Sequence, residues 1–316
     1  MSLIFGVSLC DRVYLVADTR VSYFKPGYAQ PIVAGDNINK IEVLDDDGII
    51  VAVAGSVGLS KYLINKLKKE DIVKHGINNL RENILDWIRI NIDQYLKKRP
   101  HASACLLFGG IDRTKRKKIN GKRFIELVGE FQNLSDVRLN MKEALWNGIS
   151  ATENNPNPNP ELPTPDSRVF AVLIDTKKPS LEIEDSEWGD FLVYGPNGFR
   201  KEKLSKKFFG QLEFEIGCGE LNHDRFVLTQ LMKNTERDNG FQTVGGATVY
   251  YFVDEKIGSG LITGHVFEGV VGSSEITLLT DTDVINGKLH CKDATGQYVP
   301  LIPFFEYLTN DGEYSI

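Results

Sequence analysis

The first apolar segments of the chain are short, rich in β-branched residues and separated by polar turns. Residues 3–9 and 13–17 form one such pair, and the pattern predicts an antiparallel hairpin. A turn centred midway between them places Asp18 opposite Ile4, on the face that also carries Ser2. Asp18 is then expected as a diagonal neighbour of Ser2 at the open end of the hairpin.

A second pair of apolar segments follows at once. Residues 39–44 and 49–55 flank an Asp-rich turn at 45–48 that ends in glycine, which is typical of a tight hairpin. Centring that turn places Lys40 opposite Val53. Lys40 is therefore expected near the corner that follows this strand.

Helical periodicity begins directly after the second hairpin. Leucines recur every fourth residue within 56–69, and apolar residues from Ile77 to Tyr95 mark a longer helix, so that two helices cover one sheet face. The remaining pattern predicts a strand around Leu106, a strand at 124–131, a partly helical stretch at 133–148, an exposed Asn/Pro-rich loop from 154 to 165, a strand at 169–174, a helix from Asn222 or His223 to near Gly240, a strand at 247–253 and short β-segments from 261 onward.

This order of elements predicts an α+β fold, a four-layer αββα sandwich in which two mainly antiparallel sheets are flanked by helices. The first hairpin lacks polar alternation and is expected to be buried on both faces. We expect one main domain over 1–258, with an insertion at about 133–210, and a C-terminal β-rich extension over 259–316 that packs on it.

Composition narrows the class of protein. The chain has 316 residues, 41% of them hydrophobic, which is enough for a substantial core, and its net charge of −6 argues against nucleic-acid binding. No apolar run reaches the roughly 18–20 residues of a membrane-spanning helix. The four cysteines form no CxxC pair and the five histidines show no ligand spacing, so we expect reduced thiols, a cytoplasmic location, and no metal or cofactor.

Candidate chemistry starts at Ser2. A small residue at position 2 permits removal of Met1, which would leave a serine that carries both a hydroxyl and a free α-amine. An α-amine with a reference pKa of about 7.7–8.0 can act as the base that activates such a hydroxyl. The other interpretation is an ordinary chain terminus, and a retained Met1 would block the amine.

Four short motifs near the start resemble the opening of a proteasome β-type subunit, a member of the N-terminal nucleophile hydrolases. They are Ser2-Leu3-Ile4-Phe5-Gly6-Val7, Val16-Ala17-Asp18-Thr19-Arg20, Lys40-Ile41 and Ala54-Gly55-Ser56-Val57-Gly58. Residues 106–112 are similar to the central strand of the family, and Gly217-Cys218-Gly219, Arg237-Asp238 and Gly245-Gly246 are similar to segments that complete its active site. The resemblance covers 2–112 and 213–258.

The resemblance implies a role for each matching residue. Ser2 would be the nucleophile, Lys40 would lower the pKa of the amine, and Asp18 would hold Lys40. The Gly55 amide would donate to the oxyanion and Asp238 would orient the Ser2 end. Lys40 is otherwise explained as a lysine that extends from a sheet edge, and Asp18 as a partner of Arg20.

The chain departs from the family at three points. Threonine usually stands where Ser2 is, the glycine-flanked serine is replaced by Cys218, and no serine stands just before Gly245. Cys218 is read as a small buried apolar residue or as a reactive thiol.

Two classes of function follow. The first is an N-terminal serine amidohydrolase that cleaves peptides, with a variant that cleaves a small amide; the second is a non-catalytic assembly or binding protein with the same fold. Family resemblance implies a homo-oligomer, and an ATPase partner, if there is one, is not identified by the sequence.

Overall fold

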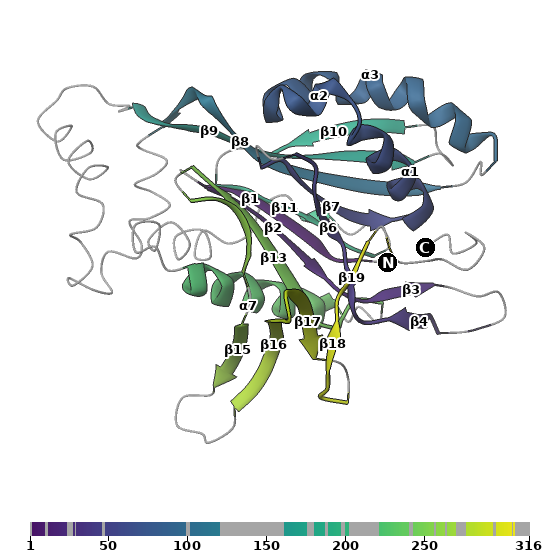
Figure 1. The fold of residues 1–316 in the computed structure, drawn as a ribbon, viewed down its shortest axis with the longest axis vertical. Coiled ribbons are helices and arrows are strands. Elements are labelled where there is room, and N and C mark those ends of the chain that lie inside the picture. Colours follow the sequence, from purple (N-terminus) through teal and green to yellow (C-terminus); the bar gives the residue numbers. More distant parts are fainter. Residues whose placement is uncertain are drawn as a thin grey trace, which may run out of the picture.

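The computed structural model shows an α+β protein with several antiparallel sheets (Figure 1). It describes residues 2–9, 12–23, 28, 30–45, 48–98, 102–120, 161–175, 180–186, 189–196, 200–201, 221–239, 243–255, 257–262, 264–269, 276–292, 295–304 and 306. Within these residues no helix is long and apolar enough to cross a membrane. Three predicted features lie outside the described residues: the strand at 124–131, the helical stretch at 133–148, and Cys218.

The first sheet is built around the N-terminal hairpin. Its strand order is β12-β11-β1-β2-β13-β14. β1 and β2 are buried at every residue, as predicted for a hairpin covered on both faces. The strands are β1 (Ile4–Ser8), β2 (Arg12–Asp18), β11 (Phe191–Tyr194), β12 (Arg200–Lys201), β13 (Thr248–Asp254) and β14 (Gly258–Ile262).

The second sheet has the order β10-β9-β8-β7-β6 and is also antiparallel. Its strands are β6 (Ile41–Val43), β7 (Ile50–Gly55), β8 (Ser103–Asn120), β9 (Glu161–Asp175) and β10 (Ser180–Asp185). Strands β9 to β11 fall within residues 133–210, the range predicted as an insertion, and they belong to the two main sheets.

Three helices follow β7 and lie over the second sheet (Figure 1). They are α1 (Val57–Leu67), α2 (Asp71–Lys74) and α3 (Gly76–Leu96). Ser56 begins α1, because its side chain accepts a hydrogen bond from the Leu59 amide at 3.3 Å. In α3 the apolar residues that face the sheet recur at helical spacing, and the buried ones include Ile77, Leu80, Ile84 and Ile88. Both long helices occur where the periodicity predicted them.

Among the described residues, two hydrophobic cores hold these layers. One lies between the sheets and combines Ile4 and Leu15 with residues of β7 to β9, such as Leu107. The other joins the second sheet to α1 and α3. α7 (Leu221–Asn239) packs on the opposite face of the first sheet, where it contacts β13 and β14 (Figure 1).

The C-terminal part is rich in β-structure. β15 (Gly264–Gly269), β16 (Ile276–Ile285), β17 (Lys288–Lys292) and β18 (Tyr298–Pro300) form a four-stranded sheet. β19 (Ile302–Pro303) leaves this sheet and pairs in parallel with β5 (Ile38–Asn39). A small hairpin of β3 (Val21–Tyr23) and β4 (Ile32–Gly35) occupies the long connection before β5.

The predicted register of the first hairpin is wrong by one residue. Ile4 pairs with Ala17, not with Asp18, because the Leu9 amide bonds to the Arg12 carbonyl and leaves only two residues between the strands. The one-residue shift places Asp18 opposite Leu3, so Asp18 lies on the opposite face of the hairpin from the one predicted. The second register is confirmed, since Ile41 pairs with Ala52 and the Val53 amide donates to the Lys40 carbonyl.

The predicted Asn/Pro-rich loop also needs correction at its end. β9 begins at Glu161 and pairs with β8 through Pro163 and Pro165. These prolines are tolerated because β10 pairs only with residues 170–175 of β9. On the side of β9 that faces away from β8, the described ladder therefore needs no backbone amide donor at the prolines.

Candidate active site

The Asp18 carboxylate lies at the centre of a buried polar cluster at the end of β2. Its Oδ1 accepts hydrogen bonds from the Leu3 amide at 2.8 Å and from Lys40 Nζ at 2.7 Å. Its Oδ2 accepts from the amides of Arg20 at 3.2 Å and Gly245 at 3.3 Å. Four donors fix this carboxylate, so its role is to hold its neighbours in place and not to move a proton itself.

Lys40 is buried together with Asp18. The two side chains are 2% and 3% exposed, and Lys40 Nζ also donates to the Arg20 carbonyl. Burial lowers the pKa of Lys40 from its ordinary value, while the charge of Asp18 and its hydrogen bond oppose that change. The ammonium is therefore held as a compact positive charge at the end of the sheet.

Ser2 stands beside this pair. It is 7% exposed, and the residue after it, Leu3, is the one whose amide binds Asp18. The Asp18 amide in turn donates to the Leu3 carbonyl at 3.1 Å. Two hydrogen bonds thus fix the strand one residue beyond Ser2. The structure brings Ser2, Asp18 and Lys40 to the same end of the first sheet.

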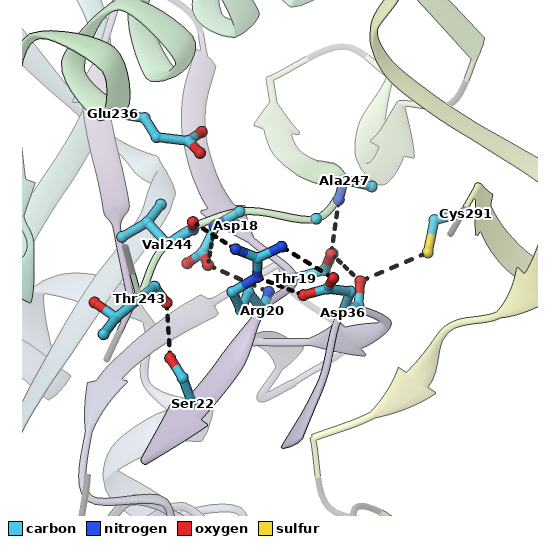
Figure 2. Close-up of polar contacts among 12 residues, drawn as sticks. Asp18, Thr19, Arg20, Ser22, Asp36, Glu236, Thr243, Val244, Ala247 and Cys291 are labelled. Atoms are coloured by element: carbon cyan, nitrogen blue, oxygen red, sulfur yellow. Dashed lines mark hydrogen bonds and ion pairs between the residues drawn. The ribbon is translucent and has the colours of Figure 1, made fainter. Parts of the chain in front are cut away.

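A second layer of contacts holds the segments around Asp18. Arg20 forms a two-point ion pair with Asp36, at 2.6 and 3.0 Å, and also reaches the Val244 carbonyl (Figure 2). The Thr19 hydroxyl donates to the Asp36 carbonyl and accepts from the Ala247 amide at 2.8 Å. Asp18 contacts Arg20, as the alternative predicted, but through the Arg20 amide, while the guanidinium binds Asp36.

Gly246 permits this close packing. Its φ is +74°, and a Cβ atom there would lie 2.4 Å from Thr19 Oγ1 and 2.7 Å from the Asp36 carbonyl oxygen. The Gly245-Gly246 pair named in the sequence therefore lies at the site, where it lets the β13 end approach Asp18.

Gly55 ends β7 in a conformation that favours glycine. Its φ is +91°, and a Cβ atom would lie 2.5 Å from the Ser103 carbonyl oxygen. Helix α1 begins two residues later, so its positive N-terminal end lies at this corner. Backbone amides at such a corner are suited to stabilise negative charge.

Gly55 also lines a pocket of about 330 Å³ at this end of the two sheets. Its walls come from both sheets: the strand ends of β7 to β10 on one side, and Tyr194 and Gly195 after β11 on the other. β11 pairs with β1 through Ile4 and Tyr194. Continuing that register by two residues brings Pro196 beside Ser2. The pocket therefore borders the strand that pairs with β1.

Sequence reasoning missed two of these residues. Asp36 and Tyr194 carry no motif, and only the packing of the segment after β4 and the pairing of β11 with β1 bring them to the site. The available signal for Tyr194 was the Tyr-Gly-Pro sequence that ends an extended segment.

Asp238 lies in the last turn of α7, at the end of the helix that precedes the Gly245-Gly246 segment. Its side chain lies outside the described residues, as does Cys218, so their predicted roles stay predictions. Within the described residues, no three His, Cys, Asp or Glu side chains gather as a metal site. Cys105 and Cys291 are buried and form no disulfide within the part of the chain that the structure describes.

Together these groups form a charged, partly enclosed site. A positive Lys40, a glycine corner at a helix N-terminus and a pocket meet at the start of β1. Such an arrangement lowers the pKa of a nearby amine and stabilises negative charge on a bound carbonyl oxygen.

The chain was also compared with known proteins. A family model described as proteasome subunit matches residues 2–121, which include Ser2, Asp18, Lys40 and Gly55. No curated protein matches the chain. The resemblance predicted from the motifs is thus confirmed over residues 2–121, where the chain is similar to proteasome subunits.

Proposed function

We propose that the chain is an N-terminal nucleophile amidohydrolase that cleaves peptides with Ser2 after removal of Met1. One observation supports this most strongly: a single oxygen of Asp18 binds both the Lys40 ammonium and the Leu3 amide, one residue from Ser2. This contact ties the charged pair to the start of the chain. A lysine that only extended from a sheet edge would not be buried there.

The proposed reaction has two halves. The Ser2 α-amine takes the proton from Oγ, and Oγ forms a bond to the carbonyl carbon of the substrate. The resulting oxyanion accepts a hydrogen bond from the Gly55 amide. The C–N bond then breaks, the leaving amine takes the proton from the α-ammonium, and the acyl group remains on Ser2 as an ester. Water attacks that ester in the second half, with the amine again acting as base, and releases the acid.

Lys40 supplies the electrostatic part of the mechanism. A positive charge beside an amine disfavours the protonated form, so the pKa of the Ser2 amine is expected to lie below its reference value of about 7.7–8.0. Asp18 keeps Lys40 in position, and Asp238 is assigned the task of orienting the Ser2 end.

The same proposal includes the finer features of fold and assembly. We assign the two sheets and their flanking helices to a four-layer αββα sandwich within one domain over 1–258, with the part after 259 as an extension. The chain is proposed to act in the cytoplasm as a homo-oligomer, and its substrate to enter the pocket between Gly55 and Tyr194.

The decisive experiment determines the N-terminus and its reactivity together. Intact mass of the protein purified from cells should show a chain that begins at Ser2. An electrophile that forms a ring with both a hydroxyl and its neighbouring α-amine should then add once, at Ser2. Two controls are matched to this test: Ser2→Ala, and a chain with a residue before Ser2 that cannot be removed.

Neither control should form the adduct. A retained Met1 together with no adduct in the wild type would reject the enzyme and favour the non-catalytic assembly protein. Adduct formation with turnover of small amides but not of peptides would reject only the peptidase assignment.

A further inference from the structure

The segment before Lys40 has few interactions of its own. β5 is two residues long, and within the described residues its ladder partner is β19 of the C-terminal part, with Ile302 opposite Ile38 and Pro303 opposite Asn39. Apart from this ladder, the Ile38 amide donates to the Thr19 carbonyl at 3.0 Å, and the Asn39 side chain donates to the Tyr251 hydroxyl. The Lys40 carbonyl accepts from the Val53 amide at 3.1 Å, so β5 fixes this residue from the other side along the chain.

The C-terminal part holds β5 through several backbone contacts. The Ile302 amide donates to the Asn37 carbonyl at 2.8 Å, and the Asn37 side chain donates to the Pro300 carbonyl at 2.9 Å. Cys291 on β17 reaches the Asp36 carbonyl at 3.9 Å (Figure 2). The same Asp36 carbonyl accepts from Thr19, the residue after Asp18.

Apolar side chains anchor this contact in both cores. Leu301 is 7% exposed and belongs to the core between the sheets, whereas Phe304 is 2% exposed and belongs to the core under α1, together with Ile38. Lys61 of α1 lies over the Phe304 ring at 5.7 Å. The segment is therefore wedged between β5, which precedes Lys40, and α1, which follows Gly55.

We infer that residues 300–304, called here the C-terminal brace, are a positioning element for Lys40. With the brace in place, β5 is clamped and the Lys40 ammonium meets Asp18 at 2.7 Å. Without it, β5 loses its ladder and the apolar contact of Phe304, and Lys40 moves off Asp18 and toward solvent. The family match over 2–121 does not include the brace.

The catalytic consequence rests on the proposed function. Misplacement of a catalytic group by about 1 Å can cost on the order of 10²-fold in rate. Removal of a nearby positive charge also lets the pKa of the Ser2 amine rise toward about 7.7–8.0.

The first test does not depend on catalysis. The full chain is treated with a lysine-acylating reagent, and the labelling of Lys40 is followed by peptide mass spectrometry against Lys74, whose side chain is 68% exposed. Phe304→Ala should raise the relative labelling rate of Lys40 by about tenfold, because β5 opens locally. Phe304→Leu should stay near the wild-type rate, since it keeps an apolar anchor. The control is Val284→Ala on β16, where the side chain is 52% exposed, and it should change nothing.

An unchanged Lys40 labelling rate in folded Phe304→Ala protein would overturn the inference. So would an equal rise at Lys233 on α7, whose side chain is 18% exposed, because it would report general unfolding in place of a local release of Lys40.

The second test uses turnover. Phe304→Ala should lower kcat by roughly 10–100-fold with little change in KM, and it should move the rising limb of the pH profile upward. A drop in kcat with an unmoved pH profile would mean that the brace stabilises the fold without tuning the site. If the wild type itself forms no adduct and cleaves nothing, the proposed function fails, and the labelling result still decides whether the brace positions Lys40.

Discussion

Strand β2 carries a buried ionic cluster at each end, and the two clusters differ in what they hold. At the start of the strand, Arg12 binds Asp224 of α7 at 3.0 Å and Asp254 of β13 at 3.1 Å. At its end, Asp18 binds Lys40 at 2.7 Å. The Arg12 cluster ties three elements through side chains, whereas the Asp18 cluster mostly fixes backbone amides around one ammonium.

The comparison shows that buried charge alone does not mark an active site. Both ends are nearly free of solvent, and breaking either pair is expected to cost about 3–5 kcal/mol because the remaining charge stays buried. Arg12 has a fork of donors that suits several partners and keeps its charge at all relevant pH values. Lys40 has a pKa lowered by burial, and it binds the carboxylate that also holds the Leu3 amide, one residue from Ser2. Under the proposed function, a charge that can be tuned next to the nucleophile is the feature that separates the two clusters.

The largest expected effect is that of Ser2→Ala. Loss of the hydroxyl should reduce peptide turnover to background, on the order of 10³-fold or more, because no nucleophile remains. The free energy of unfolding should change by less than about 1 kcal/mol, since only a hydroxyl at the start of a strand is removed. Steady-state kinetics and urea unfolding measure the two quantities.

Ser2→Thr is the matched control and should keep activity, because hydroxyl and amine both survive. Undiminished turnover by a homogeneous Ser2→Ala preparation would transfer the nucleophile role to another residue.

A reciprocal pair of substitutions tests the comparison itself. Lys40→Arg should lower turnover about 10²-fold, because the larger planar fork cannot take the place of a compact ammonium in a fully buried position. Lys40→Ala should be at least as severe. Arg12→Lys should destabilise the fold by about 1–3 kcal/mol, since one ammonium cannot reach all its partners, but leave turnover per folded molecule unchanged within about twofold.

Both variants are compared at equal folded fraction, determined from unfolding curves. If Lys40→Arg works as well as the wild type, Lys40 supplies only general positive charge. If Arg12→Lys loses turnover as steeply as Lys40→Arg, the two clusters are not functionally distinct.

Gly55→Ala should reduce turnover less than the Lys40 substitutions do. The new Cβ would lie 2.5 Å from the Ser103 carbonyl oxygen at a φ of +91°, so the corner must shift. We expect a loss of about 1–3 kcal/mol in stability and about tenfold in kcat, because the amide turns away from the oxyanion.

Gly287→Ala provides the control, since its φ is +74° and nothing lies within 4 Å of the added Cβ. It should cost stability through backbone strain and leave kcat unaltered. A Gly55→Ala enzyme with normal kcat would remove Gly55 from the oxyanion role.

The sequence allowed much of this site to be predicted, and its limits have physical causes. The second hairpin was placed correctly because its turn is marked by aspartates and a glycine, and α1 because its leucines recur at helical spacing. The first register was missed because hydrophobic periodicity does not reveal turn length. Asp36 and Cys291, 255 positions apart, meet only through tertiary packing that no local pattern records.

The smallest predicted effect is on the alkaline side of the pH profile. Burial, opposed by Asp18, lowers the pKa of Lys40, so the ammonium is lost at a pH below its ordinary value of 10.5. Turnover should fall there, because a neutral Lys40 no longer stabilises negative charge at the site.

Stability should move in the opposite direction over the same window. Between the lowered pKa and 10.5 the unfolded chain binds more protons at this residue than the folded chain, so the contribution of Lys40 to the free energy of unfolding rises with pH. Tyr14 and Tyr250 act against this at higher pH. Burial raises the pKa of Tyr250 to about 12 and that of Tyr14 well above its usual value, so stability is lost once the unfolded tyrosines ionise near 10.

The measurement is therefore made below pH 10, as the difference between wild type and Lys40→Arg, whose guanidinium does not titrate in this range. If activity falls while this stability difference rises, the alkaline limb of the pH profile belongs to Lys40. If the alkaline limb persists in the residual activity of Lys40→Arg, it belongs to another group.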